Sequence, residues 1–311
     1  MFPPLMIHRL FWIFTCCVWM ACAQLPPGNL EKSPGAAGRT PKNSEPVVIV
    51  GGGLAGLSAA IEAIKAGARV ILVDKEKDLG GNSAKASSGI NGCNTKAQRA
   101  LGISDSVDKF YSDTMSAGDR ENDQTLVDIL THESADAVKF LREHGVDLSD
   151  LCGGHSVPRT YWLPSSKEGK ALPVGVAIIR ALKNHLTELQ EEEPDSNLND
   201  YVTGVRFKNN QGRVEEITGK AVILTTGSDH DNETSLLSEF ASEKMGLPTT
   251  NGAFATGDGV KMARAMGAAV VGMEHVQVHP TAFIDPKTRL VKQSSWQRST
   301  SKQGSYIGKF Y

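Results

Sequence analysis

Three glycines near the start of the chain, Gly51, Gly53 and Gly56, have the spacing of a loop that holds phosphate groups. Such glycines allow a tight turn, a close approach of the backbone to a pyrophosphate, and close packing of a helix on a strand. The following helix would direct free N–H groups and a partial positive charge at the phosphates. Asp74 lies at the end of the next apolar run, where its carboxylate can accept hydrogen bonds from ribose hydroxyls. These residues predict a dinucleotide site.

The residues around this loop have the pattern of a βαβ unit. The apolar run from Pro46 to Val50 predicts a strand buried on both faces. Between Leu54 and Ile64 the apolar residues recur at intervals of three and four, which is one face of a helix, and Gly67 ends it. A second strand follows at 68–75. A glycine loop between a strand and a helix predicts dinucleotide binding rather than a purely structural turn.

The rest of the body continues the alternation of helices and strands. Apolar periodicity predicts helices at 123–145, 174–189 and 257–268, a strand pair with an Asn-Asn-Gln-Gly turn within 201–219, and a buried strand within 220–228. This order predicts an α/β fold with a Rossmann-like nucleotide-binding sheet.

Composition excludes several classes of protein. The chain has 311 residues, 40% hydrophobic residues, 31 glycines and a net charge of −2, and this charge gives no reason to expect nucleic acid or an anionic membrane as a partner. Beyond the first apolar segment the cysteines are Cys93 and Cys152, which provide no disulfide framework, zinc ribbon or haem-attachment motif. We therefore predict no metal site.

The N-terminus has the features of a targeting segment. His8 and Arg9 precede an apolar run at 10–23 that is too short to span a bilayer comfortably, for which about 20 residues are needed. Ala-Cys-Ala before Gln24 has the form of a cleavage site, so 1–23 predicts a cleaved signal leading to the secretory pathway, the ER lumen or an extracytoplasmic site. An uncleaved membrane anchor and a mitochondrial presequence remain alternatives. Residues 24–45, rich in Pro, Gly and Lys, predict a linker.

The segment from Asp78 to Thr95 is dense in Gly, Ser and Asn and lacks the apolar periodicity of a core helix. Such a segment suits a backbone that lies against a large flat ligand and offers N–H groups and small hydroxyls as contacts. A domain that binds only NAD has no need for it directly after the acidic strand.

Six segments, in order from Pro46 to Pro286, resemble the soluble fumarate reductase flavoproteins, within the wider succinate dehydrogenase and fumarate reductase flavoprotein group. They are VVIVGGGLAGLSAA, GGNSAKASSGIN, SAGDREND, GGHSVPRT, NGAFATGDGVKMARAMGA and VQVHPTAFIDP. The resemblance implies FAD rather than NAD, and an FAD-binding domain (its first segment) over 46–286.

Carried over position by position, the family's FAD contacts fall on Gly51, Gly53, Ala55, Gly56, Asp74, Asn82, Ser83, Ser88, Gly89 and Asp258. Asn82 stands where the membrane-bound, quinone-linked relatives have a histidine attached covalently to the flavin, so the resemblance implies non-covalent FAD. For Asp258 the alternative is a helix cap. His155 and Arg159 are expected either to lie near the flavin or substrate, or to hydrogen-bond within their loop.

The resemblance also implies a reaction. In the family, hydride passes from N5 of the reduced flavin to fumarate, an arginine protonates the other carbon, and succinate forms. His279 matches the histidine that binds a carboxylate of this dicarboxylate substrate. NADH or a reduced small flavin is the expected electron donor, and another enoate is the alternative substrate.

The chain departs from the family pattern in several places. Tyr161 replaces a usual histidine, Ser228 replaces a glycine, and the region 186–205 is too short for a strand that abuts the adenine in relatives. Residues 287–311 predict an aberrant or truncated start of the capping domain, with a shifted reading frame from near Ser294 as one hypothesis. The capping domain is then expected to be largely absent, and the alternative function is a truncated, inert flavin-binding remnant.

Overall fold

The computed structural model describes residues 45–164, 172–192, 205–209, 211–229, 235–245, 247, 249 and 251–276. The predicted signal at 1–23, the substrate residue His279 and the segment 287–311 lie outside these residues. None of the helices within the described ranges is long and apolar enough to cross a membrane.

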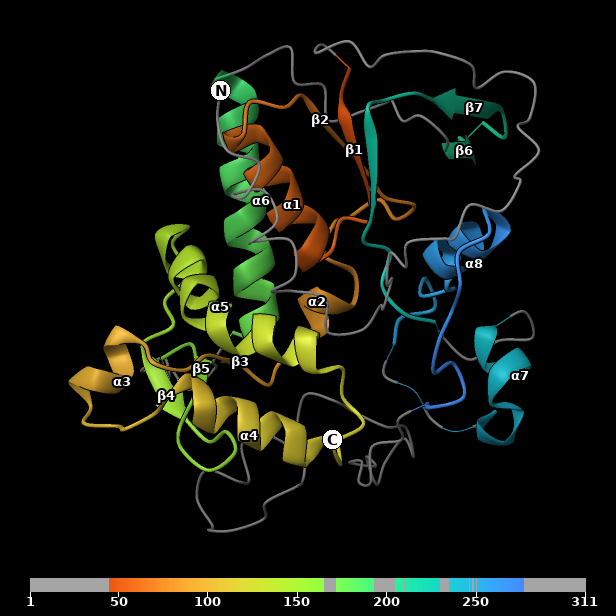
Figure 1. The fold of residues 1–311 in the computed structure, drawn as a ribbon. Helices are drawn as coiled ribbons and strands as arrows, with labels where there is room; N and C mark the ends of the chain where they lie inside the picture. Colours follow the sequence, from red (N-terminus) through yellow and green to blue (C-terminus); the bar gives the residue numbers. More distant parts are fainter. Residues whose placement is uncertain are drawn as a thin grey trace, which may run out of the picture.

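A three-stranded parallel sheet forms the centre of the fold (Figure 1). Its middle strand, β1 (Val47–Val50), pairs with β2 (Val70–Val73) on one side and β8 (Ala221–Leu224) on the other. Val48 and Ile49 of β1 are fully buried, which confirms the prediction of a strand covered on both faces.

Helices cover one face of this sheet. Ile49 packs into a core with residues of α1 (Leu54–Lys65) and α6 (Val174–Glu192), which lie against each other in Figure 1. The long helix α5 (Gln124–Glu143) joins the same core through Val138 and Leu141. The bounds of all three helices agree closely with the apolar periodicity of the sequence.

A β-hairpin covers the opposite face. Its strands β6 (Val205–Lys208) and β7 (Val214–Ile217) are antiparallel, as the sequence predicted. Ile217 packs with Val48 and Ile71, whereas their neighbours along the strands pack toward α1 and α6. This alternation follows from the two-residue period of side chains in a strand, and it gives the domain three layers.

A smaller antiparallel sheet lies beyond the helices, with strand order β3-β5-β4. Its strands and the helices around it are β3 (Ile90–Asn91), β4 (Asp150–Cys152), β5 (Thr160–Trp162), α3 (Lys96–Ala100) and α4 (Val107–Ala117). Tyr161 of β5 is fully buried. The family position of a histidine is therefore occupied by a core residue, and the Tyr161 hydroxyl hydrogen-bonds to Thr95.

The remaining elements lie near the end of β8. They are α7 (Leu236–Phe240), a 3₁₀ turn η1 (Ser242–Lys244) and α8 (Asp258–Ala265). A single bridge between Asp229 and Thr256 connects the chain after β8 to the loop before α8. The short helix α2 (Gly81–Lys85) has no buried residue, which agrees with the absence of core periodicity in the segment after β2.

Candidate functional site

The glycine turn joins β1 to α1 at the carboxyl edge of the parallel sheet. Gly51 has φ +106°, and a β-carbon there would lie 2.4 Å from the carbonyl oxygen of Thr225. A β-carbon on Gly56 would lie 1.9 Å from the carbonyl oxygen of Gly51. Backbone atoms cannot yield as a flexible side chain can, so only glycine fits at either position.

The N-terminus of α1 is open to a ligand. Its N-cap residue is Gly53, which offers no side-chain cap, and no acidic residue lies in the first turn, which includes Ala55. Ser83 of α2 accepts a hydrogen bond from Leu54 N at 3.1 Å, and a β-carbon on Gly53 would come within 3.2 Å of the Ser83 Oγ. A helix start of this kind, lined by backbone N–H groups and a hydroxyl, suits a phosphate.

Asp74 fixes the turn to the end of β2. Its Oδ2 accepts a hydrogen bond from Gly52 N at 2.7 Å, and its Oδ1 accepts one from Glu76 N at 2.8 Å. A carboxylate oxygen has more than one lone pair, so these bonds leave capacity for the predicted ribose hydroxyls. Asp74 is therefore oriented by the protein before any ligand arrives.

Asn82 holds a distant loop against α2. Its Nδ2 donates to the side-chain oxygen of Asn251 at 3.1 Å, and its Oδ1 accepts from Gly252 N at 2.9 Å. Asn251 in turn donates to the carbonyl oxygen of Asp229 at 2.7 Å. The sequence predicted Asn82 but not Asn251, although Asn251 begins one of the six matching segments.

Ser88 and Gly89 lie apart from the glycine turn, at the start of β3. Ser88 is exposed. Gly89 has φ +78°, and a β-carbon there would lie 2.7 Å from the Tyr161 carbonyl oxygen and 3.1 Å from the Trp162 ring. The Trp162 Nε1 is buried and has no hydrogen-bond partner among the described residues. A buried, unpaired N–H is costly, so this donor beside Gly89 fits an acceptor on a bound ligand.

Asp258 is the first residue of α8, and the N-cap is Gly257, with φ +66°. The alternative that Asp258 caps this helix is therefore wrong. Its Oδ2 lies 2.6 Å from the Nζ of Lys75, which also donates to the Thr256 hydroxyl at 2.5 Å. Desolvation opposes ionisation, but the hydrogen bonds from Lys75 and Thr256 and the charges of Lys75 and Lys261 outweigh it and lower the pKa of Asp258.

Arg159 has a different environment. Its side chain is fully buried, with Nη2 2.7 Å from Oδ1 of Asp105, whose side chain is also fully buried. The Arg159 Nη1 lies 2.9 Å from an Asp113 oxygen, an ion pair whose angle does not make a hydrogen bond. The guanidinium carbon lies 4.6 Å from the centre of the Phe110 ring. Arg159 therefore has partners within its own fold, whereas His155 is exposed.

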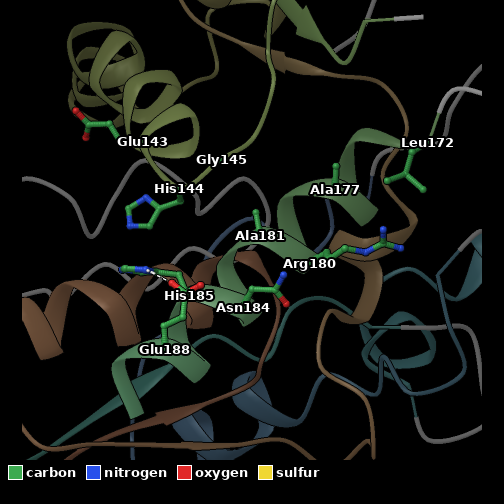
Figure 2. A pocket seen from close by; sticks show the side chains of 10 residues that line it. All are labelled: Glu143, His144, Gly145, Leu172, Ala177, Arg180, Ala181, Asn184, His185 and Glu188. Atoms are coloured by element: carbon green, nitrogen blue, oxygen red, sulfur yellow. Dashed lines mark ion pairs between the residues drawn. The ribbon is translucent and has the colours of Figure 1, made fainter. Parts of the chain in front are cut away.

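A pocket of about 460 Å³ lies between the end of α5 and one side of α6. Figure 2 shows His144 and His185 at this pocket, and their ring centres are 4.5 Å apart. Desolvation, and then the charges of Lys65 and His185, lower the pKa of His144 against the opposing hydrogen bond to the Phe140 carbonyl. The pocket shares no residue with the predicted FAD contacts, and no group of three or more metal-binding side chains occurs in the described part of the chain.

The predicted contacts therefore divide into three groups. The first group lies at the ends of β1 and β2, at the starts of α1 and α8, and in α2. Its members are Gly51, Gly53, Ala55, Gly56, Asp74, Asn82, Ser83 and Asp258. Ser88 and Gly89 lie beside β5, and His279 lies outside the described residues. An open helix start beside an oriented carboxylate can bind a phosphate and a sugar, which is the chemistry of a dinucleotide site.

Comparison with known proteins identifies relatives of this arrangement. A family model described as FAD binding domain matches residues 46–301. Fumarate reductase 1 of Saccharomyces cerevisiae is 38% identical over 269 residues, which are 81% of this chain and 55% of that protein. NADH:fumarate oxidoreductase of Klebsiella pneumoniae is 34% identical, over 81% of this chain and 28% of that protein.

A solved structure of a fumarate reductase is also similar to this chain. The open conformation of a flavocytochrome c3 fumarate reductase superposes with a TM-score of 0.69 and 32% identity, covering 80% of this chain and 45% of that one. The chain thus spans about half the length of the yeast relative and of this structure, and less of the bacterial relative.

Proposed function

The chain belongs to the FAD binding domain family, and from that premise we propose that it binds FAD without a covalent link and serves a fumarate reductase that forms succinate. The observation that supports this most strongly is the N-terminus of α1, which has no side-chain cap. Its Leu54 N donates to the Ser83 hydroxyl, and the oriented carboxylate of Asp74 lies beside it. The similarity to proteins named fumarate reductase supports the choice of substrate.

The residues present fit the cofactor. The first turn of α1 would hold the pyrophosphate, and Asp74 would accept from the ribose. The buried, unpaired Nε1 of Trp162 would donate to the cofactor near Gly89. Asn82 has an amide where a covalent link needs a histidine, and its hydrogen bonds to Asn251 and Gly252 give it a positioning role.

FAD, when bound, carries the hydride chemistry that reduces a carbon–carbon double bond. The part of this chain is to bind and orient the cofactor, and, through His279, to hold a carboxylate of fumarate. NADH is our first proposal for the electron donor, because one relative is named NADH:fumarate oxidoreductase, and a reduced small flavin is the second.

The test uses the full 311-residue chain. We expect the fluorescence of FAD to be quenched on binding, and the protein to purify with FAD bound and therefore yellow. We also expect the chemically reduced complex to be reoxidised by fumarate under anaerobic conditions. Failure to bind FAD would refute the proposal at its first step. Binding without fumarate-dependent reoxidation would refute the reductase activity of this chain and favour the inert flavin-binding alternative.

We also propose that residues 1–23 direct the protein into the secretory route, with cleavage before Gln24. The support is the sequence pattern alone. N-terminal sequencing of protein expressed in a eukaryotic cell should find Gln24 first, and a mature protein that keeps Met1 would contradict cleavage.

A further inference from the structure

Lys75 spans the carboxyl edge of the sheet. It directly follows Asp74 at the end of β2, yet its ammonium bonds to Asp258 at the start of α8, 183 positions along the chain. The second contact of the ammonium, to the Thr256 hydroxyl at 2.5 Å, belongs to the same loop. A lysine ammonium has three N–H donors, so these two contacts fix its position and leave one donor.

This crossing lies at the proposed cofactor site. Asp258 is followed by Gly259, whose N–H donates to the Thr226 hydroxyl at 3.1 Å. The adjacent Thr225 hydroxyl donates to the Gly51 carbonyl oxygen at 2.7 Å. The start of α8 is therefore connected through two neighbouring threonines to the glycine turn that precedes α1.

Charge makes the contact significant. FAD has a pyrophosphate with two negative charges, and the same sheet edge already has the carboxylates of Asp74 and Asp258. The donors to Asp74 are the neutral backbone N–H groups of Gly52 and Glu76. The donor to Asp258 is the positively charged ammonium of Lys75. Both side chains of the Lys75–Asp258 ion pair are almost half exposed, at 45% and 44%, so a ligand can reach them.

Resting on the proposed function, we propose that Lys75 is a positioning residue for FAD that acts through Asp258. Its ammonium neutralises and aims the Asp258 carboxylate, so that the start of α8 can face the dinucleotide without repelling the phosphates. Lys75 belongs to none of the residues carried over from the family resemblance, and it is assigned by its two hydrogen bonds.

The experiment is a double-mutant cycle read by quenching of FAD fluorescence with the full chain. Lys75→Met should raise the Kd for FAD about three- to fivefold, because it removes the ammonium that bonds to the Asp258 carboxylate beside the phosphates. In an Asp258→Asn background the same change should have less than about a twofold effect. Lys75→Arg, which keeps the charge, should bind FAD within about twofold of the natural chain.

A matched control separates this contact from a general loss of charge. Lys77→Met removes an exposed lysine from the same loop and should leave the Kd unchanged, and circular dichroism should show that every variant is folded. Equal weakening by Lys75→Met in both backgrounds, or no weakening at all, would overturn the role through Asp258. A natural chain that does not bind FAD would overturn the proposed function together with this inference.

Discussion

The start of α1 and the surroundings of Arg159 are both glycine-rich, polar regions that the sequence marks as candidate ligand sites, but they differ in where their hydrogen-bonding groups point. At α1 the donors are backbone N–H groups that Gly53 leaves without a side-chain cap, and of these Leu54 N donates to the Ser83 hydroxyl. Around Arg159 the cation and its carboxylate partners bond to each other inside the protein. A polar cluster can bind a ligand when its donors or acceptors are still free to form hydrogen bonds. A cluster whose groups bond to one another stabilises the fold instead.

The sharpest test of this contrast is Arg159→Met. Removing the guanidinium leaves the fully buried carboxylate of Asp105 without its cation, which typically costs about 3–5 kcal/mol of unfolding free energy. Urea denaturation should show the loss. The control Lys139→Met, in an ion pair with Glu143 on the exposed surface of α5, should leave the midpoint nearly unchanged. A small effect of Arg159→Met would show that this cluster is not structural.

The next largest effect is expected from Gly56→Ala, which should disturb the glycine turn at the start of α1. The added β-carbon would meet the Gly51 carbonyl oxygen, and overpacking of this kind costs about 1–3 kcal/mol. Because α1 must shift, we expect FAD binding to weaken at least about tenfold. Gly67→Ala meets no atom within 4 Å, and although the φ of +78° at this position costs the alanine variant some stability, the variant should keep FAD binding. Equal losses of FAD affinity in the two variants would argue against a precise turn.

Acid should weaken the Arg159 cluster through Asp113. Desolvation raises its pKa, but hydrogen bonds from Ser156 and the charges of Arg159 and His155 outweigh this and hold the pKa below 3.8. Between the lower native pKa and 3.8 the unfolded chain therefore binds more protons than the folded chain. The contribution of Asp113 to the unfolding free energy is present above pH 3.8 and is lost as the pH falls through the native pKa. Asp113→Asn should flatten the pH dependence of unfolding, and an unchanged slope would contradict the contribution.

The smallest expected effect on stability is that of Ser83→Ala. It removes the acceptor for Leu54 N, a loss similar to that of a helix cap, so the unfolding free energy should fall by about 0.5–1 kcal/mol. FAD affinity should fall severalfold, because the hydroxyl lies over the helix start. Thermal unfolding and FAD titration on the same sample measure both, and a change in stability alone would make Ser83 a structural residue only.

The sequence predicted the elements with strong periodicity and missed those with little. Apolar spacing located β1, α1, α5 and α6, but β3, β4 and β5 have only two or three residues each and show no pattern. The signal for α3 was present, because Thr95 and Gln98 form a capping box. The prediction of ligand-facing backbone ends at Thr95, so it did not extend to this helix.

The site was predicted less completely than the fold. Motif spacing identified the glycines and Asp74, because their geometry is local. The bonds of Asn82 to Asn251 and of Lys75 to Asp258 join residues about 170 and 180 positions apart, and no local pattern contains them. The role of Arg159 likewise depends on Asp105, 54 positions earlier.

The Thr225 hydroxyl, which lies 2.9 Å and 2.7 Å from the carbonyl oxygens of Val50 and Gly51, has a consequence for the order of folding. The first βαβ unit can form early from contacts close in sequence, but the glycine turn is complete only when β8 arrives, and closing so long a loop is slow. The phosphate site should therefore mature last. During refolding, acquisition of flavin would report completion of the whole sheet and not of its first half.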